Sequence, residues 1–228
     1  TRCCLNPFFT IVVGAHAEHH HTRRKVTHML ACEEMFLLLT DDTTIAHHDV
    51  LLRAALLADL LLEEAAHIDG NHKVLPTATP HHPVLAWAVE ELRNHKHLDA
   101  DALLQAEWFS PRTEIAQALS AQGAVDVEEE RWWRSERLQV TDPNVREELK
   151  RTLVAAINGP APASPQAVIL LSILREAGGA YTLLQEELEG LDRHEARERM
   201  DALQAEPELS DVQRTSLASV ATVLAALS

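Results

Sequence analysis

The chain has 228 residues, of which 46% are hydrophobic and 4% aromatic, and its formal net charge is −15 at pH 7. A chain of this length and apolar content can bury the core of a domain, which excludes an intrinsically disordered protein. The negative charge excludes a general nucleic-acid binder, because an acidic surface repels phosphate, and any attachment to an anionic membrane must use a local basic patch.

The first segment, residues 1 to 25, combines a short apolar stretch with a cluster of four histidines, His16 and His19 to His21. We expect a disordered or tag-like arm here, followed by one domain over residues 26 to 228. Imidazole nitrogens bind transition metals, but a clustered run in such an arm is more typical of adventitious binding. We therefore predict no metal site.

Cysteine content and hydropathy indicate a cytoplasmic protein. The three cysteines, Cys3, Cys4 and Cys32, provide no disulfide framework and are typical of a reducing compartment. No apolar run reaches the roughly 20 residues of a membrane-spanning helix. The run over residues 50 to 62 comes closest, but Arg53 and Asp59 interrupt it.

The first half of the domain is predicted to form helices separated by turns. Apolar spacing and breaker residues indicate the boundaries. The expected elements are an apolar helix or strand over residues 28 to 39, a long buried helix over 49 to 66, a turn at IDGNHK, a short extended piece before a Pro-rich loop, and helices over 84 to 97 and 100 to 107.

The second half is marked by caps. Ser110 and Pro111 suit the N-cap and first position of a helix that runs to Gln122 and stops at Gly123. Alternation over AVDVEEERWWRSERLQVTD predicts a β-hairpin with EEER near its tip. Further helices are expected from Asp142-Pro143 to residue 158, from Ser164-Pro165 to Gly178-Gly179, and over 180 to 188, 192 to 204 and 208 to 227.

These elements predict a mainly α fold, a single globular multi-helix domain with a protruding β-hairpin. The sequence lacks HExxH, CxxC, GxSxG and Gly-rich phosphate motifs. The acidic pairs Glu33-Glu34 and Glu63-Glu64 are expected beside helix ends or on solvated faces. We therefore predict no catalytic residues, no metal and no cofactor, and a metal-dependent enzyme that uses the histidines is the weakest hypothesis.

Arg53 is unusual because it lies near the start of the long apolar helix. Asp49 precedes it by one turn, at the spacing and in the order that favour an ion pair on a helix surface. Alternatively, a guanidinium held in a partly dry pocket can make bidentate contacts to a phosphate. The sequence alone leaves both alternatives open.

Arg112 is a second candidate anion ligand. It is predicted to occupy the second position of the helix that Ser110 and Pro111 open. The N-terminus of a helix carries unpaired N–H groups and partial positive charge, so a cation there is unfavourable unless an anion or an acidic side chain faces it.

The predicted hairpin carries the sequence RWWR, which is Arg131, Trp132, Trp133 and Arg134. Adjacent residues of a strand point to opposite faces, so one tryptophan can be buried while the other is exposed or at an interface. Tryptophan flanked by arginine suits a membrane surface, and it equally suits packing on the domain itself or on a second copy of the chain.

The chain resembles the Golgi phosphoprotein 3 family, in its actinobacterial branch, over roughly residues 28 to 225. The resemblance is carried by EEMFLLLTDD, LLRAALLADLLLEEAAHI, ALSAQGAVDVEEERWWRSERLQVTDPNVREELKRTLVAAI and AVILLSILREAGG, in this order and spacing. It implies a mostly helical fold with a protruding hairpin. In eukaryotic members it implies peripheral binding of phosphatidylinositol 4-phosphate and an adaptor role for glycosyltransferase tails.

The resemblance also assigns residues. Arg53 and Arg112 fall on phosphate-binding arginines of the family, whereas its pocket tryptophan falls near Thr44 and a further arginine on Phe109. The expected function is therefore a non-catalytic, cytoplasmic, peripheral membrane adaptor that binds an anionic, phosphoinositide-like lipid. A protein client and a homo-oligomer are compatible with it. The alternative is a soluble protein–protein interaction module in which RWWR mediates self-association.

Overall fold

The computed structural model describes residues 29–40, 45–95, 98–128, 137–159, 163–188, 190–203 and 218. The predicted arm, the RWWR sequence and nearly all of the helix expected over residues 208 to 227 lie outside these ranges. The described part confirms the mainly α class. Its elements are α1 (Ala31–Leu39), α2 (His48–Leu62), β1 (Ala66–Ile68), β2 (Val74–Pro76), α3 (Pro83–Asn94), α4 (Ala100–Gln105), α5 (Arg112–Ala121), β3 (Val125–Glu128), β4 (Arg137–Val140), α6 (Pro143–Asn158), α7 (Pro165–Glu176), α8 (Ala180–Leu184) and α9 (Arg193–Leu203).

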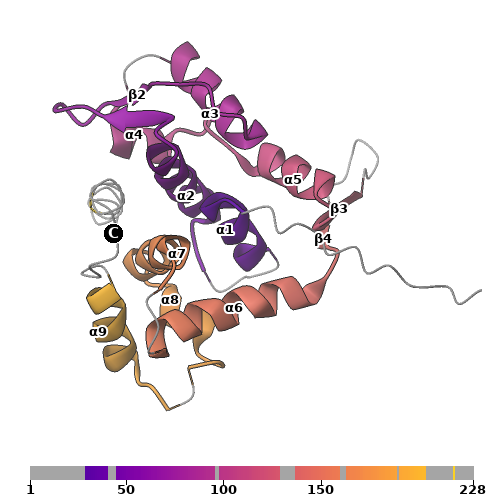
Figure 1. Cartoon of the computed structure of the whole chain (residues 1–228), viewed down its shortest axis with the longest axis vertical. Helices are drawn as coiled ribbons and strands as arrows, with labels where there is room; N and C mark the ends of the chain where they lie inside the picture. Colours follow the sequence, from indigo (N-terminus) through magenta and orange to yellow (C-terminus); the bar gives the residue numbers. More distant parts are fainter. Residues whose placement is uncertain are drawn as a thin grey trace, which may run out of the picture.

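Helices α1 and α2 lie at the centre of the molecule. Helices α3, α4 and α5 pack on one side of them, and α6 and α7 pack on the other, with α8 and α9 beyond α7 (Figure 1). This central position explains why α1, α2 and α7 are apolar on nearly every face, because a helix surrounded by others has little solvated surface.

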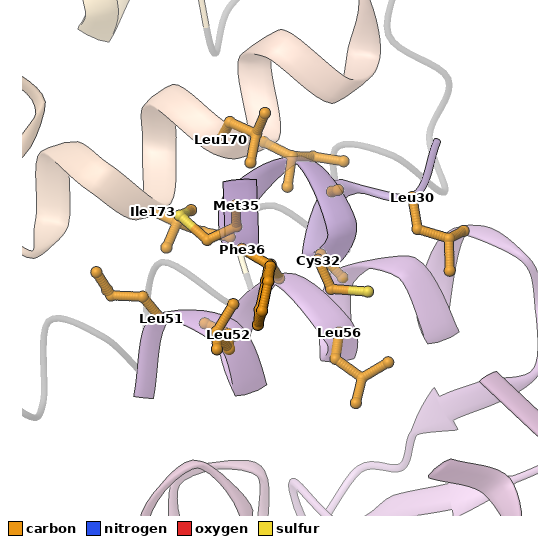
Figure 2. Packing of buried hydrophobic residues seen from close by; sticks show 14 of the residues in the cluster. Leu30, Cys32, Met35, Phe36, Leu51, Leu52, Leu56, Leu170 and Ile173 are labelled. Carbon is orange, nitrogen blue, oxygen red and sulfur yellow. The ribbon is translucent and has the colours of Figure 1, made fainter. Parts of the chain in front are cut away.

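These three helices contribute the largest share of the core residues. Figure 2 shows Met35 and Phe36 of α1 among Leu52 of α2 and Leu170 and Ile173 of α7, all of them almost completely buried. Burying one such side chain stabilises the fold by about 1.5 to 3 kcal/mol. Within the described residues, no helix is both long enough and apolar enough to span a bilayer.

Among the described residues, two antiparallel hairpins accompany the helices. Strands β3 and β4 pair from Val125 with Val140 to Glu128 with Arg137, which confirms the base of the predicted hairpin. The turn at IDGNHK closes a second hairpin, in which Ile68 pairs with Val74 and Ala66 with Pro76. The sequence indicated the turn and one extended piece of this hairpin but not the pairing.

Several predicted caps are confirmed. The Asp142 side chain accepts a hydrogen bond from the Asn144 N–H at the start of α6, and the Ser164 hydroxyl accepts one from Ala167 at the start of α7. Gly123 and Gly178, each with φ of 70°, follow the ends of α5 and α7. These are left-handed positions that glycine occupies without steric cost.

Several predicted boundaries are wrong. The helices expected over residues 100 to 107 and 180 to 188 end at Gln105 and Leu184. The second helix ends at Leu62 and not at residue 66, because Glu64 has a left-handed φ of 52° and Ala66 joins strand β1. Helix α3 ends at Asn94 and not at residue 97. Ser110 is not the N-cap of α5; Pro111 occupies that position, so Arg112 is the first helical residue and not the second.

Candidate functional site

The Arg53 side chain is buried, with 6% exposure, and it bonds to the main chain of another part of the molecule. Its Nε donates to the Phe109 carbonyl at 2.8 Å, and its Nη1 donates to the Leu104 carbonyl at 2.9 Å. Leu104 lies in the last turn of α4, where carbonyls have no partner within the helix and attract positive charge. Arg53 therefore caps α4 and fixes residues 106 to 111, the α4–α5 segment.

The ion pair that sequence spacing suggested for Arg53 does not form. Asp49 is exposed, and within the described part of the chain no salt bridge joins it to Arg53. A guanidinium has five N–H groups, so the two carbonyls leave capacity for a further acceptor. The geometry therefore allows the second alternative, in which Arg53 also contacts an anion.

Arg112 lies at the start of α5 and is exposed. The central carbon of its guanidinium lies 5.7 Å from the centroid of the Phe36 ring of α1, which is a cation–π contact. The ring face therefore accounts for a cation at a helix N-terminus without an acidic partner. The contact also holds the arginine at one place on the surface while its N–H groups remain accessible to solvent.

The chain brings the two arginines into one region. The Phe109 carbonyl accepts from Arg53, and Phe109 precedes Arg112 by three residues. The Cα atoms of Phe109 and Arg112 therefore lie within about 11 Å of each other. The first turn of α5 also has N–H groups without a side-chain acceptor, because Pro111 has none to offer. Glu114, in the same turn, is the nearest opposing charge on this helix.

An aromatic cluster surrounds the α4–α5 segment, and the sequence analysis did not predict it. Phe109 is fully buried and stacks on Trp87 of α3, with ring centroids 5.4 Å apart. Trp108 meets Phe109 edge to face at 5.5 Å and stacks on His95 at 3.7 Å. The adjacent aromatics at 108 and 109 were the available signal. Phe109, at the position of a further family arginine, is thus a core residue.

Glu33 lies beside a helix end, which is one of the two positions expected for it, and not on a solvated face. Its side chain is fully buried at the start of α1, where Oε2 accepts from the Leu30 N–H at 3.0 Å. Its Oε1 accepts from Gln122 Nε2 at 3.0 Å and lies 3.5 Å from His82 Nε2. Glu33 therefore joins the start of α1 to the end of α5 and the start of α3.

Asp59 of α2 completes this buried polar region. Its two carboxylate oxygens accept from the N–H groups of Ala31 at 3.0 Å and Cys32 at 2.8 Å, in the first turn of α1. Burial raises the pKa of Asp59 to about 7, although these backbone bonds lower it. Burial, followed by the charges of Asp59 and Glu33, also raises the pKa of Glu34 to about 7.

The histidines form no metal centre in the described ranges. No group of three or more histidine, cysteine, aspartate or glutamate side chains there is arranged to hold a metal ion. The Arg131, Trp132, Trp133 and Arg134 side chains lie outside the described residues, as does Thr44, so the candidate site consists of the α4–α5 segment, Arg53 and Arg112.

Comparison with known proteins gives one informative result. The family model for Golgi phosphoprotein 3 (GPP34) matches residues 31–222, a span that contains both hairpins and all of α1 to α9. A search of curated proteins found no match.

Proposed function

Because the chain belongs to the Golgi phosphoprotein 3 family, we propose that it is a non-catalytic peripheral membrane adaptor that binds the phosphorylated head group of an anionic lipid at the start of α5. The observation that carries this proposal is the exposed Arg112 guanidinium beside a helix N-terminus with no side-chain cap. N–H groups and a cation at one point are the chemistry that a phosphate requires.

In this proposal the two arginines have different roles. Arg112 contacts the phosphate directly, with the first-turn N–H groups of α5. Arg53 is held by two carbonyls and acts first as a positioning residue, since it fixes the segment from which α5 begins. Its remaining N–H groups and its positive charge add to the attraction for an anion.

The aromatic cluster and the hairpin provide the remaining membrane contacts. Trp108 is half-buried on the α4–α5 segment, close in sequence to Arg112. Tryptophan combines an apolar ring with a polar N–H group and is favoured where a membrane meets water. On sequence grounds, the Arg131 to Arg134 tip of the hairpin has the same character and contacts either the membrane or a second copy of the chain.

The test is co-sedimentation with vesicles of phosphatidylcholine, with and without a small fraction of phosphatidylinositol 4-phosphate. A mostly neutral bilayer limits repulsion of the chain, whose net charge is −15. We expect binding that requires the phosphoinositide and weakens with salt. Arg112→Gln should weaken it about tenfold or more, as the loss of a charged hydrogen bond predicts. The matched control is Arg197→Gln, an exposed arginine of α9, which should bind like wild type.

The proposal fails if folded wild-type protein does not bind vesicles that contain the phosphoinositide, or if the Arg112→Gln variant binds them as strongly as wild type does. The net charge favours a second candidate function in that case, a soluble protein–protein interaction module, because a strongly acidic surface suits a basic protein partner better than a membrane. Equal binding to vesicles of phosphatidylcholine alone would also count against the head-group site.

A further inference from the structure

The first two N–H groups of α1 are held by a side chain from another helix. The N-cap of α1 is Leu30, which offers no side-chain acceptor, so the first N–H groups of the helix depend on Asp59 of α2. Unsatisfied buried N–H groups are costly, so this contact decides whether the first turn of α1 stays in place.

Helix α5 is tied to α1 near both of its ends. Gln122, its C-cap residue, donates to Glu33, and Arg112, its first residue, lies over Phe36. Loosening of the first turn of α1 therefore removes one of these two contacts between α1 and α5.

The region around the first turn of α1 contains more acidic than basic side chains. Three carboxyl groups gather here, Glu33, Glu34 and Asp59, which we call the carboxyl cluster. The other titratable groups that face it are the Cys32 thiol, beside Asp59, and the His82 imidazole from the start of α3. Helix α5 contributes the neutral Gln122. In the described part of the chain, no lysine or arginine pairs with the cluster.

We propose that the carboxyl cluster is a pH-sensitive contact, in which a bound proton keeps the first turn of α1 closed on α2 and α5, and loss of that proton promotes local opening. With the proton bound, the buried space holds one negative charge fewer, and Asp59 and Glu33 keep their hydrogen bonds. Without it, two or three carboxylates repel one another where water cannot screen them.

The direction follows from linkage. In the open form Asp59 and Glu34 are hydrated and their pKa values return to the ordinary range, so opening releases the proton and a rise in pH favours it. The His82 Nε2 atom lies 3.5 Å from Glu33 Oε1. Its Nδ1 is buried without a hydrogen-bond partner among the described residues, so it adds no competing contact there.

Cys32 provides a built-in reporter, because it is fully buried in the first turn and becomes reactive only when that turn opens. The experiment uses full-length protein with Cys3→Ser and Cys4→Ser, so that a disulfide reagent labels Cys32 alone. The labelling rate of Cys32 is measured from pH 6 to pH 8, at reagent concentrations over which the rate is proportional to the concentration. At each pH it is divided by the labelling rate of free glutathione. The division removes the effect of thiol ionisation on the open form.

If opening releases one proton from a carboxyl group whose pKa is about 7 in the closed form, the normalised labelling rate of Cys32 should rise about tenfold from pH 6 to pH 8. Asp59→Asn should reduce the rise to about threefold or less. Asp49→Asn, which removes an exposed carboxylate from the same helix, should keep the full rise. If Asp59→Asn does not fold, Glu34→Gln replaces it, with the same reduction expected.

A flat wild-type profile would overturn the inference, as would an equal rise in wild type and in the cluster variants. The measurement contains no lipid, so its outcome is independent of the proposed membrane function. A pH-dependent opening together with failed vesicle binding would keep this contact and remove only the adaptor proposal.

Discussion

Replacing Arg53 with alanine tests the central contact of the candidate site. The change removes two hydrogen bonds from a charged donor and leaves the carbonyls of Leu104 and Phe109 without that donor. A hydrogen bond to a charged group contributes about 1.5 to 3 kcal/mol, so we expect the loss of two such bonds to lower the free energy of unfolding by about 3 to 6 kcal/mol. For a chain of this size, that corresponds to a fall of roughly 6 to 24 °C in Tm.

Two further substitutions separate the causes. Arg53→Met keeps most of the side-chain volume but no donor, so it should lose nearly as much stability as the alanine variant. Arg53→Lys retains a charge that can reach one carbonyl, so it should recover about half of the loss. Asp49→Ala should change stability by less than about 0.5 kcal/mol, because Asp49 is exposed and unpaired with Arg53.

The assay is urea unfolding followed by circular dichroism and by tryptophan fluorescence. Two of the four tryptophans, Trp87 and Trp108, lie beside Phe109. With Trp132 and Trp133 replaced by phenylalanine in every variant, fluorescence reports on the α4–α5 segment, and circular dichroism reports on the helices as a whole. The reasoning is refuted if Arg53→Ala costs less than about 1 kcal/mol, or if Asp49→Ala costs as much as Arg53→Ala, which is the signature of an ion pair between them.

The remaining predictions concern helix ends and pH. Ser164→Ala should lose about 1 kcal/mol because the Ala167 N–H loses its cap, and Ser164→Asp, which keeps an acceptor, serves as its control in urea unfolding. Gly178→Ala should lose about 1 kcal/mol because φ there is 70°, and an unchanged urea midpoint would contradict this. The pKa values of Asp59 and Glu34 are raised to about 7 in the folded chain, so the folded chain binds more protons than the unfolded chain below pH 7. The free energy of unfolding should therefore fall as the pH rises from 5 to 7 and level off above pH 7. The slope is up to about 1.4 kcal/mol per pH unit for each extra proton bound. Urea midpoints that rise over this interval would contradict it.

The sequence was most informative where the cause of a structure lies within a few residues. Asp142-Pro143 and Ser164-Pro165 predicted the starts of α6 and α7 because a cap and a proline act on the adjacent turn. The resemblance carried by longer blocks predicted the family and the hairpin, and the match over residues 31–222 confirmed the family.

Contacts between distant residues could not be predicted in this way. The only rule that spacing offers for Arg53 is a partner one turn away, and that rule indicated Asp49. Its acceptors are 51 and 56 residues further along the chain, and they are carbonyls, which leave no trace in the sequence. The burial of Glu33 at the start of α1 was not predicted for the same reason, since its partner Gln122 lies 89 residues away.

The acceptors of Arg53 have a consequence for how related sequences should vary. Every residue type has a main-chain carbonyl, so positions 104 and 109 can change among apolar residues without losing either bond, whereas position 53 can be satisfied only by arginine. An alignment would then show an invariant arginine opposite variable neighbours, the same pattern that a ligand-binding arginine produces. An invariant arginine at position 53 would therefore reflect a requirement of the fold. Variation at the exposed position 112 is the better indicator of whether phosphate binding has been gained or lost.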